Sequence, residues 1–157
     1  MPAPFRRDDR PEPALDAIWP GYLLEGYFDA NGNLHPDLLA RKKVEPLVKA
    51  MTEARIRLTN NQLRRFFQHC RAIEARLRAR ASSWDAERAT FEKLDISAAD
   101  AFKGGGNGAK IPRLFHDFIK LNVAAVGSEK DFLHGFLPHF EALVGFGAPH
   151  VRDDDRR

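Results

Sequence analysis

The sequence predicts an all-α protein, a compact bundle of about five helices preceded by a flexible N-terminal tail. Two observations lead to this prediction. Apolar residues recur at i, i+3, i+4 and i+7 spacing from residue 37 almost to the end of the chain, and no strand pattern follows residue 36. With 157 residues and one cysteine, the chain fits a single domain without an internal disulfide.

The first part of the chain is predicted to form a tail and then a loop. Residues 1–20 contain five prolines among charged side chains, and such a segment can neither continue a helix nor bury a useful apolar face. Residues 21–36 combine aromatic side chains with an Asn31-Gly32 turn signal, typical of a short hairpin or a packed loop. We favour the packed loop, because no later strand could complete a sheet. The domain boundaries are therefore 1–20 for the tail, 21–148 for the bundle and 149–157 for a charged C-terminal tail.

The first helix follows residue 37 and contains a proline. Pro46 leaves two interpretations, namely that the helix starts there or that it kinks near Glu45. Its buried side is expected to hold Leu39, Val44, Leu47, Val48, Met51 and Ala54.

Serine and threonine caps predict the start of the next two helices. Thr59 is expected to cap the second helix and Ser83 the third. The buried side of the second is predicted to hold Leu63, Phe66, Phe67, Cys70, Ile73 and Leu77. The third is predicted to bury Trp84, Phe91 and Leu94, with Ile96, Ala99 and Phe102 as further candidates. Residues 104–108, four of them glycine, end it.

Two more helices are predicted in the last third of the chain. Pro112 opens the fourth, which stops near Gly127, and Ser128 with Asp131 resembles a capping arrangement for the fifth, which Pro138 should kink. The fourth carries Leu114, Phe115, Phe118 and Leu121, and the fifth carries Phe132, Leu133, Phe136, Phe140, Leu143 and Val144.

Charge is unevenly distributed along the chain. Residues 41–80 hold 12 basic and 3 acidic side chains, a net charge of +9, whereas the whole chain has a net charge of +3. A local positive field of this kind favours a polyanionic partner, although charged helix faces also occur without one.

Arginines on the second helix form a stripe beside its apolar side. On a helical wheel, Arg64, Arg71 and Arg78 lie within about 40° of one another, spaced about 10.5 Å apart along the axis. Arg65, Arg76 and Arg80 occupy the other flank. Guanidinium groups suit phosphate oxygens, so the stripe can follow a nucleic-acid backbone without reading its sequence. The alternative is a soluble arginine-rich surface.

The glycine-rich loop is a second candidate for phosphate contact, together with Lys103, Lys110 and Arg113. It lacks the Gly-Lys-Ser/Thr sequence and the preceding strand of a nucleotide-binding P-loop. A flexible connector is the competing interpretation.

Nothing in the sequence predicts an enzyme. His134 and His139 are five residues apart, which does not stack them on one helical face, and Cys70 lies in the apolar row of its helix. We therefore expect no catalytic residue, metal or cofactor. Neither an export leader nor a membrane span is recognisable, so a cytoplasmic protein is expected.

Three segments resemble the small subunit of type III-A CRISPR effector complexes. The helix over residues 58–77 is similar to the signature helix of that family. Residues 27–34 resemble its N-terminal segment, and residues 131–144 its terminal helix. The similarity covers residues 22–148.

The resemblance implies a non-catalytic helical subunit, present in several copies, that supports antiviral defence. Its implied partners are guide RNA and target RNA, the repeating backbone subunit, other copies of itself and the large catalytic subunit, without a membrane. Base pairing supplies sequence recognition there, so this subunit needs only backbone contacts. The chain departs from the family at residues 98–110, where a lysine-rich, aromatic-containing segment is common. The predicted RNA-binding residues are Arg64, Arg65, Arg71, Arg78, Lys103, Lys110 and Arg113. The alternative function is a structural adaptor whose basic face binds an acidic protein.

Overall fold

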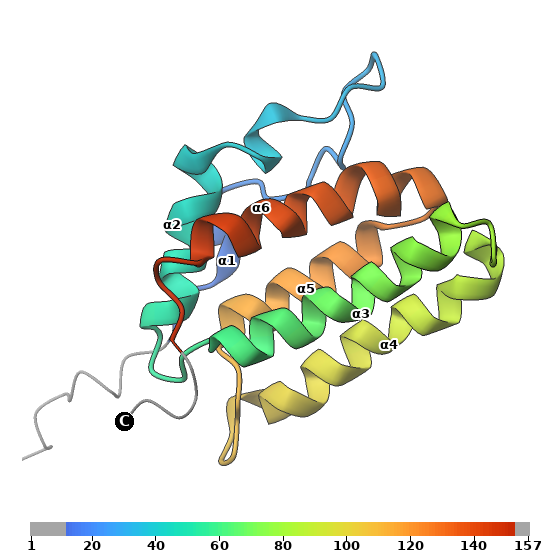
Figure 1. Ribbon diagram of the computed structural model, residues 1–157. Coiled ribbons are helices and arrows are strands. Elements are labelled where there is room, and N and C mark those ends of the chain that lie inside the picture. Colours follow the sequence, from blue (N-terminus) through green and yellow to red (C-terminus); the bar gives the residue numbers. More distant parts are fainter. Residues whose placement is uncertain (1–11, 153–157) are drawn as a thin grey trace, which may run out of the picture.

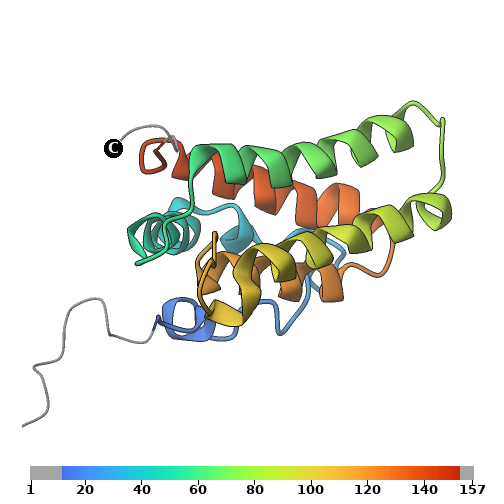
Figure 2. The ribbon, with the colours of Figure 1, turned by 90° about the horizontal axis from the view of Figure 1, so that it is seen from below.

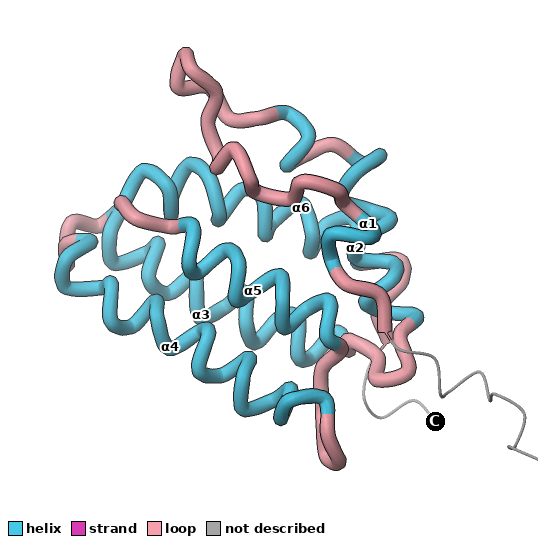
Figure 3. The backbone as a smooth tube through the Cα atoms, turned by 180° about the vertical axis from the view of Figure 1, so that it is seen from behind, coloured by secondary structure: helices cyan, strands magenta, loops and turns pink. Residues whose placement is uncertain are grey.

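Five α-helices of 11–19 residues make up most of the described chain. A computed structural model describes residues 12–152, and it shows helices joined by loops (Figures 1 and 3). The α-helices are α1 (Leu15–Ile18), α2 (Arg41–Glu53), α3 (Asn60–Arg78), α4 (Trp84–Phe102), α5 (Arg113–Ala125) and α6 (Leu137–Gly147). Shorter turns are the 3-10 helices η2 (Pro36–Leu38) and η3 (Lys103–Gly105) and the π-helical turn η4 (Asp131–Phe136). The predicted all-α bundle is confirmed.

Four of these helices run side by side, and α2 crosses one end of them. Figures 1 and 2 show α3, α4, α5 and α6 as a four-helix bundle, with α3 on an outer edge between α4 and α6. The core is unusually aromatic. Phe66 packs edge-on against Phe115, with ring centroids 5.1 Å apart, and Phe118 packs edge-on against Phe140 at 5.5 Å. Such pairs add stabilisation beyond the apolar area that they bury.

Helix α2 begins before its proline and continues past it. It runs from Arg41 to Glu53, so the alternative in which the helix starts at Pro46 is wrong, whereas the kink near Glu45 stays a prediction. Pro46 has no N–H to donate to the carbonyl four residues earlier, and the helix tolerates this one missing bond because its apolar row is buried. Leu39, expected in that row, is 41% exposed, and its neighbour Leu38 is buried instead.

Both predicted N-caps are confirmed. Thr59 accepts a hydrogen bond from the Gln62 amide, and the Gln62 side chain accepts one from the Thr59 amide, which completes a capping box. Ser83 accepts one from the Ala86 amide.

Three apolar residues expected on buried sides face solvent instead. Ile96 is 67% exposed and Leu121 is 41% exposed, and Ala99 is exposed while Ala98 is fully buried. Ala99 and Leu121 each lie one residue from a buried position, and Ile96 lies midway between the buried Leu94 and Ala98. The reason is that α4 and α5 each bury a stripe set by their contact with one another, which the sequence of either helix alone does not define.

A π-helical turn precedes the proline of the last helix. Ser128 accepts a hydrogen bond from the Asp131 amide, as expected for a cap. Residues 131–136 then widen into η4, whose helical backbone continues into α6 with Pro138 as its second residue, and the kink expected at Pro138 stays a prediction. Gly135 lies in η4 against Tyr27, and a Cβ atom there would stand 2.7 Å from Tyr27 Cγ.

The N-terminal segment is folded from residue 15 onward. Leu15 and Trp19 are buried in the core, so the predicted tail over residues 1–20 is wrong for residues 15–20; residues 1–11 lie outside the described range. The following segment is a packed loop, as favoured, with one antiparallel bridge between Phe28 and Leu34. The predicted C-terminal tail also begins too early, because Val151 packs against the core.

A directional hydrogen-bond network fixes the N-terminal segment to the bundle. The Leu38 carbonyl can only accept, so His139 Nδ1 donates to it at 2.6 Å and His139 Nε2 accepts from the Tyr22 hydroxyl at 2.7 Å. Asn122 Nδ2 donates to the Tyr22 oxygen at 2.8 Å, and the Tyr27 hydroxyl donates to Asn122 Oδ1 at 2.8 Å. His139 is therefore neutral in the folded protein.

We expect the stability of the protein to fall in mild acid because of His139. Burial lowers the pKa of its imidazole to about 4, although the hydrogen bond to the Leu38 carbonyl acts in the opposite direction. In the unfolded chain this group takes a proton near pH 6.5, so the free energy of unfolding should decrease between about pH 6.5 and 4, by up to about 3 kcal/mol. Urea unfolding at several pH values measures this decrease.

Two variants test whether His139 is the cause. His139→Gln, which cannot titrate, should show a shallower dependence of unfolding free energy on pH than the wild type, and His134→Gln, on an exposed side chain, should keep the wild-type dependence. Equal slopes for the wild type and His139→Gln would contradict the assignment.

Candidate nucleic-acid interface

Helix α3 presents an arginine-rich outer face. Its buried row, which packs toward the core, consists of Leu63, Phe66, Cys70, Ile73 and Leu77. The opposite side carries five arginines and one glutamate. Because α3 lies on an outer edge of the bundle (Figure 2), this face is open along its length.

The predicted stripe lies along the edge of α3 that faces α6. Phe67 is half-buried there, against the expectation that it lies in the core, with its ring edge-on to Phe140 at 5.2 Å. The Arg71 guanidinium lies 5.6 Å from the Phe67 ring centroid. This contact holds Arg71 on the same edge.

Two arginines of the stripe share one carboxylate. Arg71 donates to Glu74 at 2.7 Å, and Arg78 donates to the other oxygen of Glu74 at 2.9 Å. Half of the positive charge of these two groups is therefore neutralised locally. Arg64, nearer the start of the helix, has no hydrogen bond or ion pair with any residue in the range 12–152.

The other edge of α3 faces α4. Arg76 donates twice to Glu87 of α4, at 2.9 and 2.6 Å. Hydrogen bonds from Arg76 and Ser82 hold the pKa of Glu87 below its ordinary value, so the pair stays charged. Arg65, on this edge, is exposed and lacks a partner among the described residues.

The glycine-rich loop lies beside the first turn of α3. The Gln62 side chain donates to the Lys110 carbonyl, which connects the loop to the helix. Lys103 and Lys110 are exposed on this loop. Arg113 is paired with Asp117 at 3.4 Å on its own helix, so it is the least available of the three.

The candidate residues therefore divide into two groups. Arg64 and Arg65 lie near the start of α3, the end at which the loop that carries Lys103 and Lys110 meets the helix. Arg78 lies at the opposite end of α3. That all seven predicted residues contact RNA remains a prediction.

One exposed cation near an aromatic ring, Lys130, was not predicted from the sequence. Lys130 Nζ lies 4.3 Å from the Phe28 ring centroid, beside the turn at Gly32. About 100 residues separate the lysine from that ring, so no local pattern could have indicated the pair.

Other potentially reactive groups are structural. Burial raises the pKa of the Cys70 thiol, and the side chain is fully buried. Within residues 12–152, no three His, Cys, Asp or Glu side chains are grouped to hold a metal ion. In the same range, no helix combines the length and apolarity needed to span a bilayer.

The comparisons with known proteins give one family. The model of the family described as Csm2 Type III-A matches residues 41–150, more than half of the chain. The matched range contains α2 to α6, and it leaves out residues 27–34, whose resemblance remains a prediction. No curated protein and no solved structure matches the chain.

Proposed function

Because the chain belongs to the Csm2 Type III-A family and is thus a small subunit of a type III-A CRISPR Csm complex, we propose that it contacts RNA through the basic face of α3. In this role the subunit supports the guide RNA and target RNA by their phosphates, without catalysis, and contributes to antiviral defence. The backbone subunit, the large subunit and further copies of this chain are its proposed neighbours.

One observation favours this function most. Arg64 and Arg65 are exposed at one end of α3 with no carboxylate partner in the described part of the chain. Lys103 and Lys110 add charge from the loop at the same end. Unpaired arginines on a rigid helix suit phosphate oxygens, and such contacts position a nucleic acid without reading its sequence.

We expect the triple variant Arg64→Ala, Arg65→Ala, Arg71→Ala to weaken target-RNA binding by the assembled complex. Every phosphate contact that the variant removes should reduce the slope of log affinity against log salt by about 0.7 for single strands and about 0.9 for duplex. Target-RNA affinity is measured from low to high salt for complexes of matched subunit composition.

A matched triple variant provides the control. Arg88→Ala, Lys93→Ala, Lys120→Ala removes the same charge from exposed positions on α4 and α5, and it should keep the wild-type slope. Equal affinity and slope for the α3 variant and the wild type would reject RNA contact and favour the adaptor function.

A further inference from the structure

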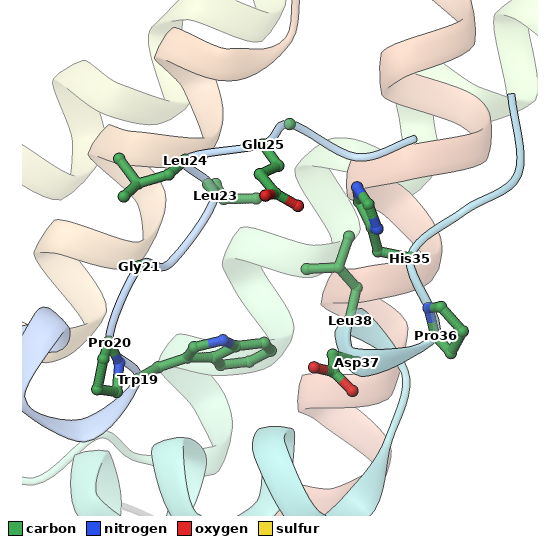
Figure 4. Close-up of a pocket in the computed structure, with 11 residues that line it drawn as sticks. Trp19, Pro20, Gly21, Leu23, Leu24, Glu25, His35, Pro36, Asp37 and Leu38 are labelled. Atoms are coloured by element: carbon green, nitrogen blue, oxygen red, sulfur yellow. The ribbon is translucent and has the colours of Figure 1, made fainter. Parts of the chain in front are cut away.

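A cavity lies on the N-terminal segment, away from α3. Its volume is about 470 Å³, within the range of ligand-binding pockets. Figure 4 shows side chains from the loop and from η2 converging on one opening. The residues that line it and carry the argument are Trp19, Leu23, Glu25, His35, Asp37 and Leu38. All precede residue 41, where the family match begins.

The apolar walls of this pocket are held in place by the core. Trp19 packs edge-on against Tyr22 at 5.0 Å and against His139 at 5.8 Å. Leu38 is buried, and its carbonyl accepts the His139 hydrogen bond. The pocket is therefore formed before any ligand arrives, which lowers the entropic cost of binding.

The polar groups of the pocket lack partners. Glu25 and Asp37 are exposed carboxylates, and neither has an ion pair with a described residue. His35 Nε2 is buried and makes no hydrogen bond with the described part of the chain. Figure 4 shows the Glu25 carboxylate directed toward the His35 ring, with Asp37 at the opposite rim. The site thus offers two exposed negative charges.

We propose that this pocket receives an arginine side chain from a protein partner. The aliphatic part of an arginine suits the walls formed by Trp19, Leu23 and Leu38, and its planar guanidinium carries five donors for the carboxylates.

Charge argues against the other classes of ligand. An RNA phosphate would meet two carboxylates and be repelled, and residues 1–40 as a whole carry 3 basic and 7 acidic side chains. A metal site is also unsupported, because the described residues contain no cluster of three or more suitable ligands. The acidic pocket and the basic face of α3 therefore serve different partners.

An exposed leucine at the rim indicates that the partner also brings an apolar residue. Leu24 is 84% exposed, the largest exposure among the exposed large hydrophobic side chains described. The preceding Leu23 has a left-handed backbone, with φ of 59°, which is costly for a residue with a branched side chain. The loop thus places Leu24 outward at the rim, where a neighbouring apolar side chain would cover it.

Photo-cross-linking in the assembled complex identifies the occupant. With p-benzoylphenylalanine in place of Leu24, we expect a cross-link to a protein segment that contains arginine, located by mass spectrometry. Cross-links to RNA, to a segment without arginine, or to residues 1–11 of the same chain, which include three arginines, would overturn the proposal, as would the absence of any protein cross-link.

Charge removal tests the contact itself. Glu25→Gln with Asp37→Asn should raise the concentration for half-maximal incorporation of the subunit at least about tenfold, because the guanidinium loses its charged acceptors. Glu92→Gln with Asp100→Asn removes two exposed acids from α4 and should leave incorporation unchanged. Equal incorporation of the two variants, with matching thermal midpoints, would overturn the proposal.

Exchange of charges gives the final test, and RNA binding separates the two proposals. Once the partner arginine is located, its replacement by glutamate should be rescued by Glu25→Arg.

Salt-dependent RNA binding by the free subunit should be unchanged in the pocket variants and reduced in the α3 variant. The pocket can thus be rejected while RNA contact stands, and the reverse also holds.

Discussion

Phe66→Ala is expected to lower the free energy of unfolding by about 3–5 kcal/mol. The ring is 4% exposed and packs edge-on against Phe115 across the centre of the bundle. Its removal reduces the buried apolar area and leaves a cavity that rigid neighbouring rings cannot fill. Urea unfolding with an unchanged m-value measures the loss of stability as a change in midpoint.

The neighbouring phenylalanine is the matched control for this prediction. Phe67 is only half-buried, at the edge of α3, so Phe67→Ala should cost about 1–2 kcal/mol. The two positions are adjacent and carry the same side chain, so the comparison reports mainly their difference in burial. Equal losses of stability would contradict the orientation of α3 in the bundle.

Asn122→Leu is expected to cost about 2–4 kcal/mol although leucine has a similar size. Asn122 is fully buried, and its amide donates to Tyr22 and to the Phe118 carbonyl while its oxygen accepts from Tyr27. Leucine leaves these buried groups without their partner. Asn61→Leu, on an exposed position of α3, should change the unfolding free energy by less than about 0.5 kcal/mol.

A double-mutant cycle separates the removal of hydrogen bonds from altered packing at this site. Tyr27→Phe removes the hydroxyl that Asn122→Leu leaves without its side-chain acceptor. The double variant should therefore cost less than the sum of the two single variants. Strict additivity, or a destabilisation by Asn122→Leu no larger than that by Asn61→Leu, would show that the network adds nothing to stability.

Local signals in the sequence predicted the parts of the fold that depend on neighbouring residues. The Thr59 and Ser83 caps were predicted correctly because a cap involves residues three apart. The buried row of α3 followed from spacing alone, apart from Phe67 at its margin. The placement of the arginine stripe on one edge of α3 was likewise a matter of helical geometry.

Long-range contacts account for what the sequence did not predict. Arg76 pairs with Glu87 on another helix, and Tyr22 and Tyr27 bond to side chains about 100 residues later. No periodicity encodes such pairs. The ion pairs of Glu74 with Arg71 and Arg78 could have been predicted from the sequence, because these residues are three and four positions apart on one helix.

The network around Asn122 also determines when the N-terminal segment can fold during synthesis of the chain. Tyr22 leaves the ribosome 100 residues before Asn122 and 117 residues before His139. At a translation rate of about 5–20 residues per second, roughly 5–20 s pass between the synthesis of Tyr22 and the synthesis of its hydrogen-bond partners. During that interval Trp19 and both tyrosines lack the helices that bury them, so these aromatic side chains stay exposed on the nascent chain until the last helix is made.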